Sequence, residues 1–353
     1  MSDHVETVKR AIEFKKPEYL PMEINQVPGI YNAYYTLDPS SVELIPGTES
    51  FDAIWPQGYS WVTKETGKSE SGESIRKDQF GNLIKIPRNM NATYDFLGSV
   101  LKGKDSLDGY KFPDIEDLDR HFKNFGDIVK SRYPDRFLNC YIDAGFYLTT
   151  YFMIGTTDFF IDVATNISFV MDVYEQVVEY YKKMVLKYKQ AGAHMITVIE
   201  DLGTNSGLAI NPKTWVKEFK PVLKGFFSFV HEQGLYTSLC VDGNAEPLHE
   251  HLVDMGVDVF FMPDIETTGI TKVRQNLKGK ICLKAPVDMK TTLSNGTPQQ
   301  VEKAAMEIVD ALNDKSGGFI CEVVKWYRPE YPMQNVLASV KGFNNYRSHA
   351  LGK

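Results

Sequence analysis

Polar side chains stand where several short apolar runs of this sequence end. Glu200 and Asp201 end one run, Asp242 follows the next, and Lys325 follows the last. Carboxylates beside a single lysine suit proton transfer, and they repel a polyanionic substrate. We therefore predict that these four residues are catalytic. Two plainer interpretations stay open, because Glu200 and Asp201 could cap the following segment and the stretch from Asp242 to Asn244 could be a simple turn.

The elements that must position these residues follow one repeating pattern from about residue 136. A short apolar run, a turn with Gly or Asp, an amphipathic helix and a Gly-rich return succeed one another, and such alternation is typical of a parallel sheet. The runs are 137–143, 194–200, 235–241, 257–262, 280–287 and 318–324, with two earlier ones at 20–24 and 51–55. Eight runs predict an α/β fold of the (β/α)8 TIM-barrel type, in which strand ends converge on one mouth.

Two helices are clearly marked. Residues 168–189 place apolar side chains at spacings of three and four on one face, and Gly192 should end this helix. Residues 298–312 should form another, with Thr297 as N-cap and Pro298 in the first helical position. Both are expected on the outside of the barrel.

Residues 62–115 interrupt the alternation with a polar stretch rich in Lys, Glu, Ser and Gly. Within it, residues 78–84 are typical of a hairpin around Gly81 and Asn82. We interpret the stretch as a loop insertion after the second strand, over the barrel mouth. No low-complexity linker is present, so we expect a single domain over residues 1–353, elaborated in its N-terminal region.

The predicted mouth is also rich in aromatic and amide side chains. Flat aromatic walls favour a flat ligand, although aromatics at loop bases also serve simply to cover a barrel core. The residues expected to contact a substrate are Glu23, Gln26, Trp55, Tyr59, Phe146, Tyr147, Asn244 and Tyr327.

Composition excludes several classes of protein. The formal net charge is −7, charged residues make up 24% of the chain, and no run of five or more like charges occurs, so nucleic acids and anionic membranes are poor partners. A signal peptide and a long apolar span are both missing from the sequence, which favours a cytoplasmic location. The four cysteines are interpreted as thiols.

Four segments of the chain resemble the uroporphyrinogen decarboxylase superfamily of (β/α)8 barrels. They are 143–151, then 191–194 with 199–203, then 241–244 with 256–258, and finally 317–320 with 332–335, and the resemblance spans about residues 18–346. True decarboxylases of this superfamily have an arginine-rich loop after the first strand, which binds the carboxylate arms of a porphyrinogen. This chain has no arginine from residue 11 to 75 and cannot offer that bidentate clamp.

A second branch of the superfamily comprises methyltransferases that exchange a methyl group with the cobalt of a corrinoid protein, in methanogens and in acetogenic or related anaerobes. Its thiol-methylating members share a His-x-Cys after strand five and a Cys after strand eight that hold zinc. Here Cys240 and Asp242 occupy the first two positions, and the third falls near Lys325. Zinc accepts Cys and Asp ligands, and Glu266 or Asp264 could complete a site, so we name Cys240, Asp242 and Glu266 as candidate ligands.

The resemblance implies a corrinoid-dependent methyltransferase of anaerobic one-carbon metabolism. We expect O-demethylation, in which a small donor, typically an aromatic methyl ether, gives its methyl group to a corrinoid carried by a partner protein. One alternative is transfer from the methylated corrinoid to a folate or thiol, and another is a decarboxylase-like lyase acting on a different small acid. A catalytically idle binding barrel is the third. The oligomeric state stays open, with a homodimer among the alternatives.

Overall fold

Eight parallel strands close a barrel in the computed structural model of this protein, which describes residues 3–25, 51–55, 63–86, 95–118, 127, 131, 134–325 and 331–350. The strands are β1 (Met22–Asn25), β2 (Ala53–Trp55), β7 (Phe137–Ile142), β8 (Met195–Glu200), β9 (Tyr236–Val241), β10 (Val259–Phe261), β11 (Cys282–Ala285) and β12 (Phe319–Glu322). Seven of them lie within the apolar runs, and β1 extends one residue past its run, to Asn25, so the predicted (β/α)8 fold is confirmed.

The barrel strands pair in chain order, apart from the insertion between β2 and β7. The ring closes where Glu23 of β1 pairs in register with Glu322 of β12. Parallel pairing turns all eight carboxyl ends to the same side. Residues that follow different strands, such as Asp242 and Lys325, are thereby brought to one mouth.

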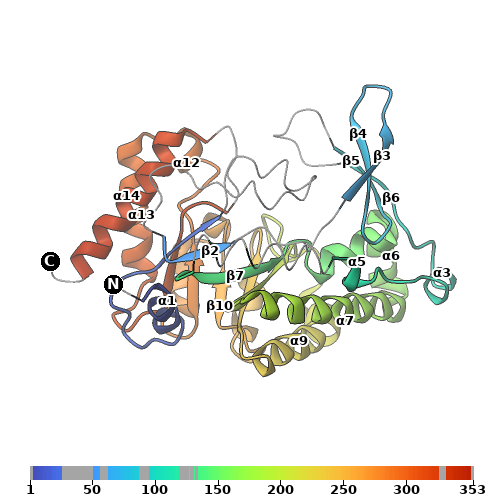
Figure 1. Ribbon diagram of the computed structural model, residues 1–353, viewed down its shortest axis with the longest axis horizontal. Helices are drawn as coiled ribbons and strands as arrows, with labels where there is room; N and C mark the ends of the chain where they lie inside the picture. The colour runs from blue at the N-terminus through green and yellow to red at the C-terminus, as the bar shows by residue number, and fades with distance from the viewer. Residues whose placement is uncertain are drawn as a thin grey trace.

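Helices cover the outside of the barrel, as expected (Figure 1). The longer ones are α1 (His4–Ile12), α5 (Phe146–Ile154), α6 (Thr156–Thr165), α7 (Ile167–Ala191), α9 (Lys220–Glu232), α11 (Ile270–Leu277), α13 (Pro298–Leu312) and α14 (Met333–Ala350). Shorter helical segments are α3 (Asp105–Asp108), η2 (Ile115–Leu118), α8 (Pro212–Thr214), η3 (Trp215–Phe219), η4 (Glu246–His251), α10 (Ile265–Thr268) and α12 (Thr292–Asn295). Within the part of the chain described, no helix combines the length and apolarity needed to cross a bilayer.

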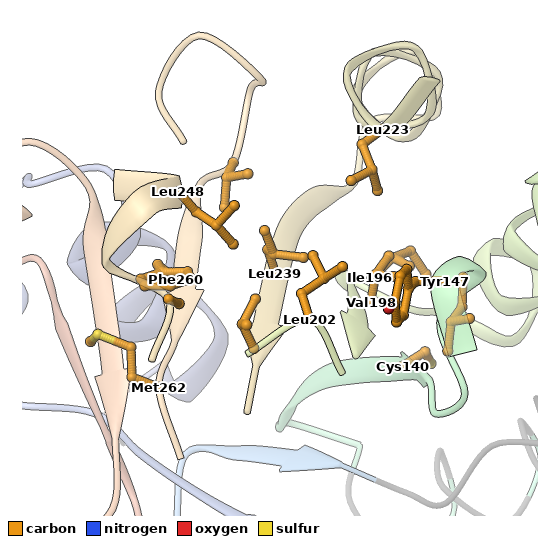
Figure 2. Packing of buried hydrophobic residues seen from close by; sticks show 14 of the residues in the cluster. Cys140, Tyr147, Ile196, Val198, Leu202, Leu223, Leu239, Leu248, Phe260 and Met262 are labelled. Carbon is orange, nitrogen blue, oxygen red and sulfur yellow. The ribbon is translucent and has the colours of Figure 1, made fainter. Parts of the chain in front are cut away.

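Helix α7 buries the face that its sequence predicts. Val173, Val177 and Met184 are fully buried, and Gly192 ends the helix in a left-handed conformation with φ 98°. Figure 2 shows buried side chains between the strands and the outer helices, among them Leu239 of β9 and Leu223 of α9. The core between strands and helices is therefore continuous.

Helix α13 begins with the capping box that Thr297 predicts. The Thr297 hydroxyl accepts the backbone N–H of Gln300, and the Gln300 side chain accepts the backbone N–H of Thr297. We expect Thr297→Ala to lower the free energy of unfolding by about 1 kcal/mol, measured by urea denaturation. An unchanged midpoint and slope would show that the Thr297 cap contributes nothing. Gln300→Ala removes the other bond of the box and should also destabilise the protein.

The insertion between β2 and β7 forms a second sheet. Strands β3 (Thr63–Lys68), β4 (Ser74–Asp78), β5 (Leu83–Ile86) and β6 (Asp95–Gly98) are antiparallel, and β4 and β5 form the predicted hairpin around Gly81 and Asn82. In Figure 1 this sheet lies toward α5 and α6. Phe96 stacks on Phe152 of α5 at 5.3 Å between ring centroids, and Phe80 packs against Tyr180 of α7 at 5.2 Å. The insertion is thus more regular than the predicted loop.

The barrel interior changes character from bottom to top. Its amino-terminal end is apolar, where Val8 and Ile12 of α1 pack against side chains such as Phe137 and Met195. The next level upward holds charged side chains, including the fully buried Lys284. A (β/α)8 barrel is usually filled by apolar layers, so this polar level is unusual.

Candidate active site at the barrel mouth

An ion pair between Lys325 and Asp242 stands at the mouth. The Lys325 ammonium lies 2.6 Å from both carboxylate oxygens of Asp242. The lysine side chain is 3% exposed and the aspartate side chain 32% exposed, so solvent reaches the pair from the aspartate side. Burial alone would lower the pKa of Lys325, but the Asp242 carboxylate outweighs it, and the pKa is raised. Lys325 is therefore a fixed positive charge.

Asp201 joins this pair because the loops after β8 and β9 touch through their backbones. A Cβ atom on Gly203 would lie 2.1 Å from the carbonyl oxygen of Asp242, so only glycine fits there. The Asn244 N–H donates to the Thr204 carbonyl at 2.8 Å and holds the two loops together. Because of the close approach at Gly203, we expect any side chain at this position to push the two loops apart and to separate Asp201 from Asp242.

The pKa of the Asp201 carboxyl is raised, as is that of Glu266. The Asp201 side chain is exposed, yet the protein around the mouth displaces enough water to raise the pKa of this carboxyl. The carboxylates of Asp242 and Asp264 raise the pKa further, and the Lys325 ammonium opposes them. This raised pKa makes Asp201 a candidate proton donor at the mouth.

Glu200 does not join the mouth, although it is the neighbour of Asp201 in sequence. Successive side chains of a strand point to opposite faces, so the two carboxyls cannot both face the barrel interior. Glu200 is fully buried and accepts the backbone N–H groups of Phe146 at 3.0 Å and Tyr147 at 2.9 Å. Glu200 is thus a capping residue, but it caps the start of α5, which precedes β8 in sequence, and not the segment that follows β8.

Burial raises the pKa of Glu200 to about 8, against the opposing effect of the two N–H groups. Because the Glu200 carboxyl binds the amino-terminal end of α5, outside the barrel, the structure does not support its predicted catalytic role. Glu200 therefore does not lie with Asp242 and Lys325 at the barrel mouth, contrary to the prediction.

The predicted zinc ligands do not form a metal site. Among the described residues, no three His, Cys, Asp or Glu side chains are grouped closely enough to hold a metal ion. Cys240 is fully buried among Tyr141, Ile199 and Phe261, and burial raises the pKa of its thiol. Asp242 binds Lys325, as described above. A raised thiol pKa and a carboxylate already neutralised by an ammonium make a poor donor set for zinc.

The third predicted ligand, Glu266, belongs to a second ion pair at the mouth. Lys290 lies 3.0 Å from Asp264 and 3.5 Å from Glu266, and its side chain is half exposed. The other oxygen of Asp264 accepts the Gly243 N–H at 3.1 Å, which ties this pair to the loop after β9. The mouth therefore offers two lysines, and the predicted excess of carboxylates is partly neutralised.

Several predicted substrate contacts have other partners. Asn244 accepts the Glu246 N–H at 3.0 Å and shapes its own turn. Phe146 is fully buried, with its ring 4.7 Å from that of Phe226, and Tyr147 is nearly so, with its ring 5.1 Å from that of Phe159. These two rings lie in the helix layer rather than against a ligand. Gln26, Tyr59, Tyr327 and the side chain of Trp55 lie outside the described residues.

Glu23 is also not at the mouth, because it is fully buried inside the barrel. Its carboxylate accepts hydrogen bonds from Lys284 and Tyr141, and Lys284 also lies 2.7 Å from Glu322. Sequence reasoning missed Lys284 and Glu322. The signal was available, since each is a charged residue within an apolar run, two positions after the inward-facing residues Cys282 and Ile320.

Comparisons with known proteins were consistent with this architecture. Residues 102–346 match the sequence profile of the family described as uroporphyrinogen decarboxylase (URO-D). A solved methyltransferase from Methanosarcina mazei aligns over 98% of this chain and 99% of its own, at 14% identity and a TM-score of 0.76. An endo-beta-1,4-xylanase from Gloeophyllum trabeum aligns over 94% of this chain and 98% of its own, at 10% identity and a TM-score of 0.48. No curated protein sequence matches.

Proposed function

The chain belongs to the uroporphyrinogen decarboxylase (URO-D) family, and from this premise we propose that it is a methyltransferase acting between a small methyl donor and the cobalt of a corrinoid protein. The fold likeness to the Methanosarcina mazei methyltransferase along nearly the whole chain supports the proposal. The observation that carries it is the mouth itself, where a buried Lys325 ammonium stands beside Asp242 and beside Asp201, whose pKa is raised.

This arrangement suits the release of an oxygen leaving group. When the methyl carbon of an ether is transferred, the electron pair of the C–O bond stays on the oxygen, which becomes negatively charged. Lys325 stabilises that charge, and Asp242 holds the ammonium in place. Asp201 then donates its proton to the oxygen, so that the leaving group departs as a neutral alcohol or phenol. Reduced corrinoid on a partner protein supplies the nucleophile that receives the methyl group.

The same residues argue against porphyrinogen decarboxylation. A porphyrinogen carries several carboxylates, which need arginine partners, and residues 11–75 contain no arginine. The carboxylates of Asp242 and Asp264 at the mouth would repel such a substrate. Transfer of a methyl group to a thiol ranks below the ether reaction because no set of zinc ligands for thiol activation comes together among the described residues.

The proposal is tested by mixing the purified protein with a reduced corrinoid protein and a panel of aryl methyl ethers. We expect the Co(I) absorbance to convert to that of methyl-Co(III) with at least one donor, and to release one equivalent of phenol. A second set of reactions starts from the methylated corrinoid with a folate or a thiol. Conversion only in the second set would overturn the ether proposal in favour of the partner reaction, and none in either set would overturn methyl transfer.

A further inference from the structure

Three charged side chains are enclosed inside the barrel, below the mouth. Glu23 of β1, Lys284 of β11 and Glu322 of β12 are each at most 1% exposed. We call them the interior cluster. β12 lies between β1 and β11 in the barrel, so the cluster joins three neighbouring strands. Ions in such a dry place are costly unless their charges are balanced and their hydrogen bonds are satisfied.

The two carboxyl groups of the interior cluster are not equally supplied with donors. Glu23 accepts from Lys284, from the Tyr141 hydroxyl at 2.9 Å and from the Asn139 amide at 3.0 and 3.1 Å. Asn139 is itself oriented by the Thr197 hydroxyl at 2.8 Å. Glu23 therefore sits in a site built for an anion.

Glu322 has a much poorer environment for a negative charge. Its Oε2 lies 2.7 Å from the Lys284 ammonium, but neither oxygen has a hydrogen bond of good geometry among the described residues, and the backbone N–H of Val324 lowers its pKa least of all the neighbouring groups. Lys284 carries one positive charge, which Glu23 already balances. A second anion at this place would leave the interior with a net negative charge in a medium of low polarity, so one of the two carboxyls should keep its proton.

We propose that Glu322 carries a proton in the folded protein, and that the interior cluster thereby couples the stability of the barrel, and with it the placement of Lys325, to pH. Burial, opposed by Lys284 and assisted by Glu23, raises the pKa of Glu322 to about 8. Among the described residues, the other titratable groups that face the cluster are Tyr141 on β7, Cys240 on β9 and Cys282 on β11, and burial raises the pKa of each well above neutrality. None of them can take over the titration.

The direction of the effect follows from linkage. Between pH 4.5, the ordinary pKa of a glutamate here, and about 8, the folded protein holds a proton on Glu322 that the unfolded chain releases. Stability contributed by this group is therefore greatest in acid and falls as the pH rises to about 8. Because Lys325 follows Glu322 by three residues, loosening of the end of β12 would displace the mouth ammonium; this last step rests on the proposed function.

The test compares wild type with Glu322→Gln, which imitates the protonated acid. Infrared difference spectra at pH 7 should show a carboxylic-acid C=O band in wild type that Glu322→Gln loses. The thermal midpoint of wild type should fall from pH 5 to 9 more steeply than that of the variant, and the variant should be the more stable at pH 9. Glu232→Gln, on the exposed surface of α9, is the matched control and should change neither measurement.

A second variant keeps the test decisive if Glu322→Gln fails to fold. Lys284→Met removes the only cation of the cluster, so both carboxyls should be protonated and the C=O band should grow. A wild-type spectrum equal to that of Glu322→Gln, or a band unchanged in Lys284→Met, would overturn the proposal. Both spectra are independent of methyl transfer, so they stand even if no donor is found. If transfer is found, Glu322→Gln should retain its rate to higher pH than wild type.

Discussion

Replacing Lys325 with methionine is expected to lower kcat/KM for methyl transfer by about 100- to 10,000-fold. The ammonium lies 2.6 Å from both oxygens of Asp242 and is the charge that faces the leaving oxygen in the proposed reaction. Methionine keeps nearly the length and the apolar stem of lysine, so the decrease in rate should report the loss of the positive charge. The rate of methyl-Co(III) formation at limiting donor concentration measures the effect.

The control for this variant is Lys272→Met. Lys272 is an exposed lysine that also binds a carboxylate, Glu246 at 2.7 Å, but on a helix surface rather than in the Lys325 pair. It should keep the wild-type rate. Equal activity of Lys325→Met and wild type would show that the mouth ammonium takes no part in the reaction. Circular dichroism of both variants separates a loss of rate from a loss of fold.

Gly145→Ala should cause the largest loss of stability, about 3–5 kcal/mol in the free energy of unfolding. Gly145 has a positive φ of 55°, and a Cβ atom there would lie 2.0 Å from the carbonyl oxygen of Ile199 and 2.9 Å from the Glu200 carboxylate. Both obstacles belong to β8, which cannot move without opening the barrel. The bonds from Glu200 to the start of α5 would be lost as well. Denaturant unfolding followed by tryptophan fluorescence measures the change.

Gly225→Ala is the matched control because it makes the same substitution without the obstruction. Gly225 lies inside α9, and an added Cβ atom would meet nothing within 4 Å. Alanine is the better helix former, so this variant should be more stable than wild type by about 0.5–1 kcal/mol. A similar loss in both variants would mean that the close approach at Gly145 is not what limits this position.

The fold could be predicted from the sequence because its signals are local. Each barrel strand is a short apolar run bounded by polar or glycine residues, and α13 begins at a Thr-Pro pair that forms its cap as expected. The hairpin at Gly81 follows from the same kind of short-range pattern. Parallel strands bring their carboxyl ends together, which is why Asp242 and Lys325 lie 2.6 Å apart although 83 residues separate them in sequence.

The direction of individual side chains could not be predicted as well. Glu200 and Asp201 are adjacent, so the sequence places both at the end of a strand. Because side chains alternate along β8, Glu200 points toward α5 and Asp201 toward the mouth. The depth of Glu23 in the barrel could not be predicted either, because it lies one level below the mouth and binds Lys284. Its partner is 261 residues away in sequence, and no local pattern indicates which distant charge will meet it.

The central claim is that Asp242 and Lys325 act as one unit in methyl transfer, and a double-mutant cycle tests it most directly. Single-turnover rates of methyl-Co(III) formation are compared for Asp242→Asn, Lys325→Met and the double variant. If Asp242 acts by holding the ammonium, the double variant should be about as slow as Lys325→Met alone. Two losses that simply multiply would contradict the claim, since each side chain would then act without the other.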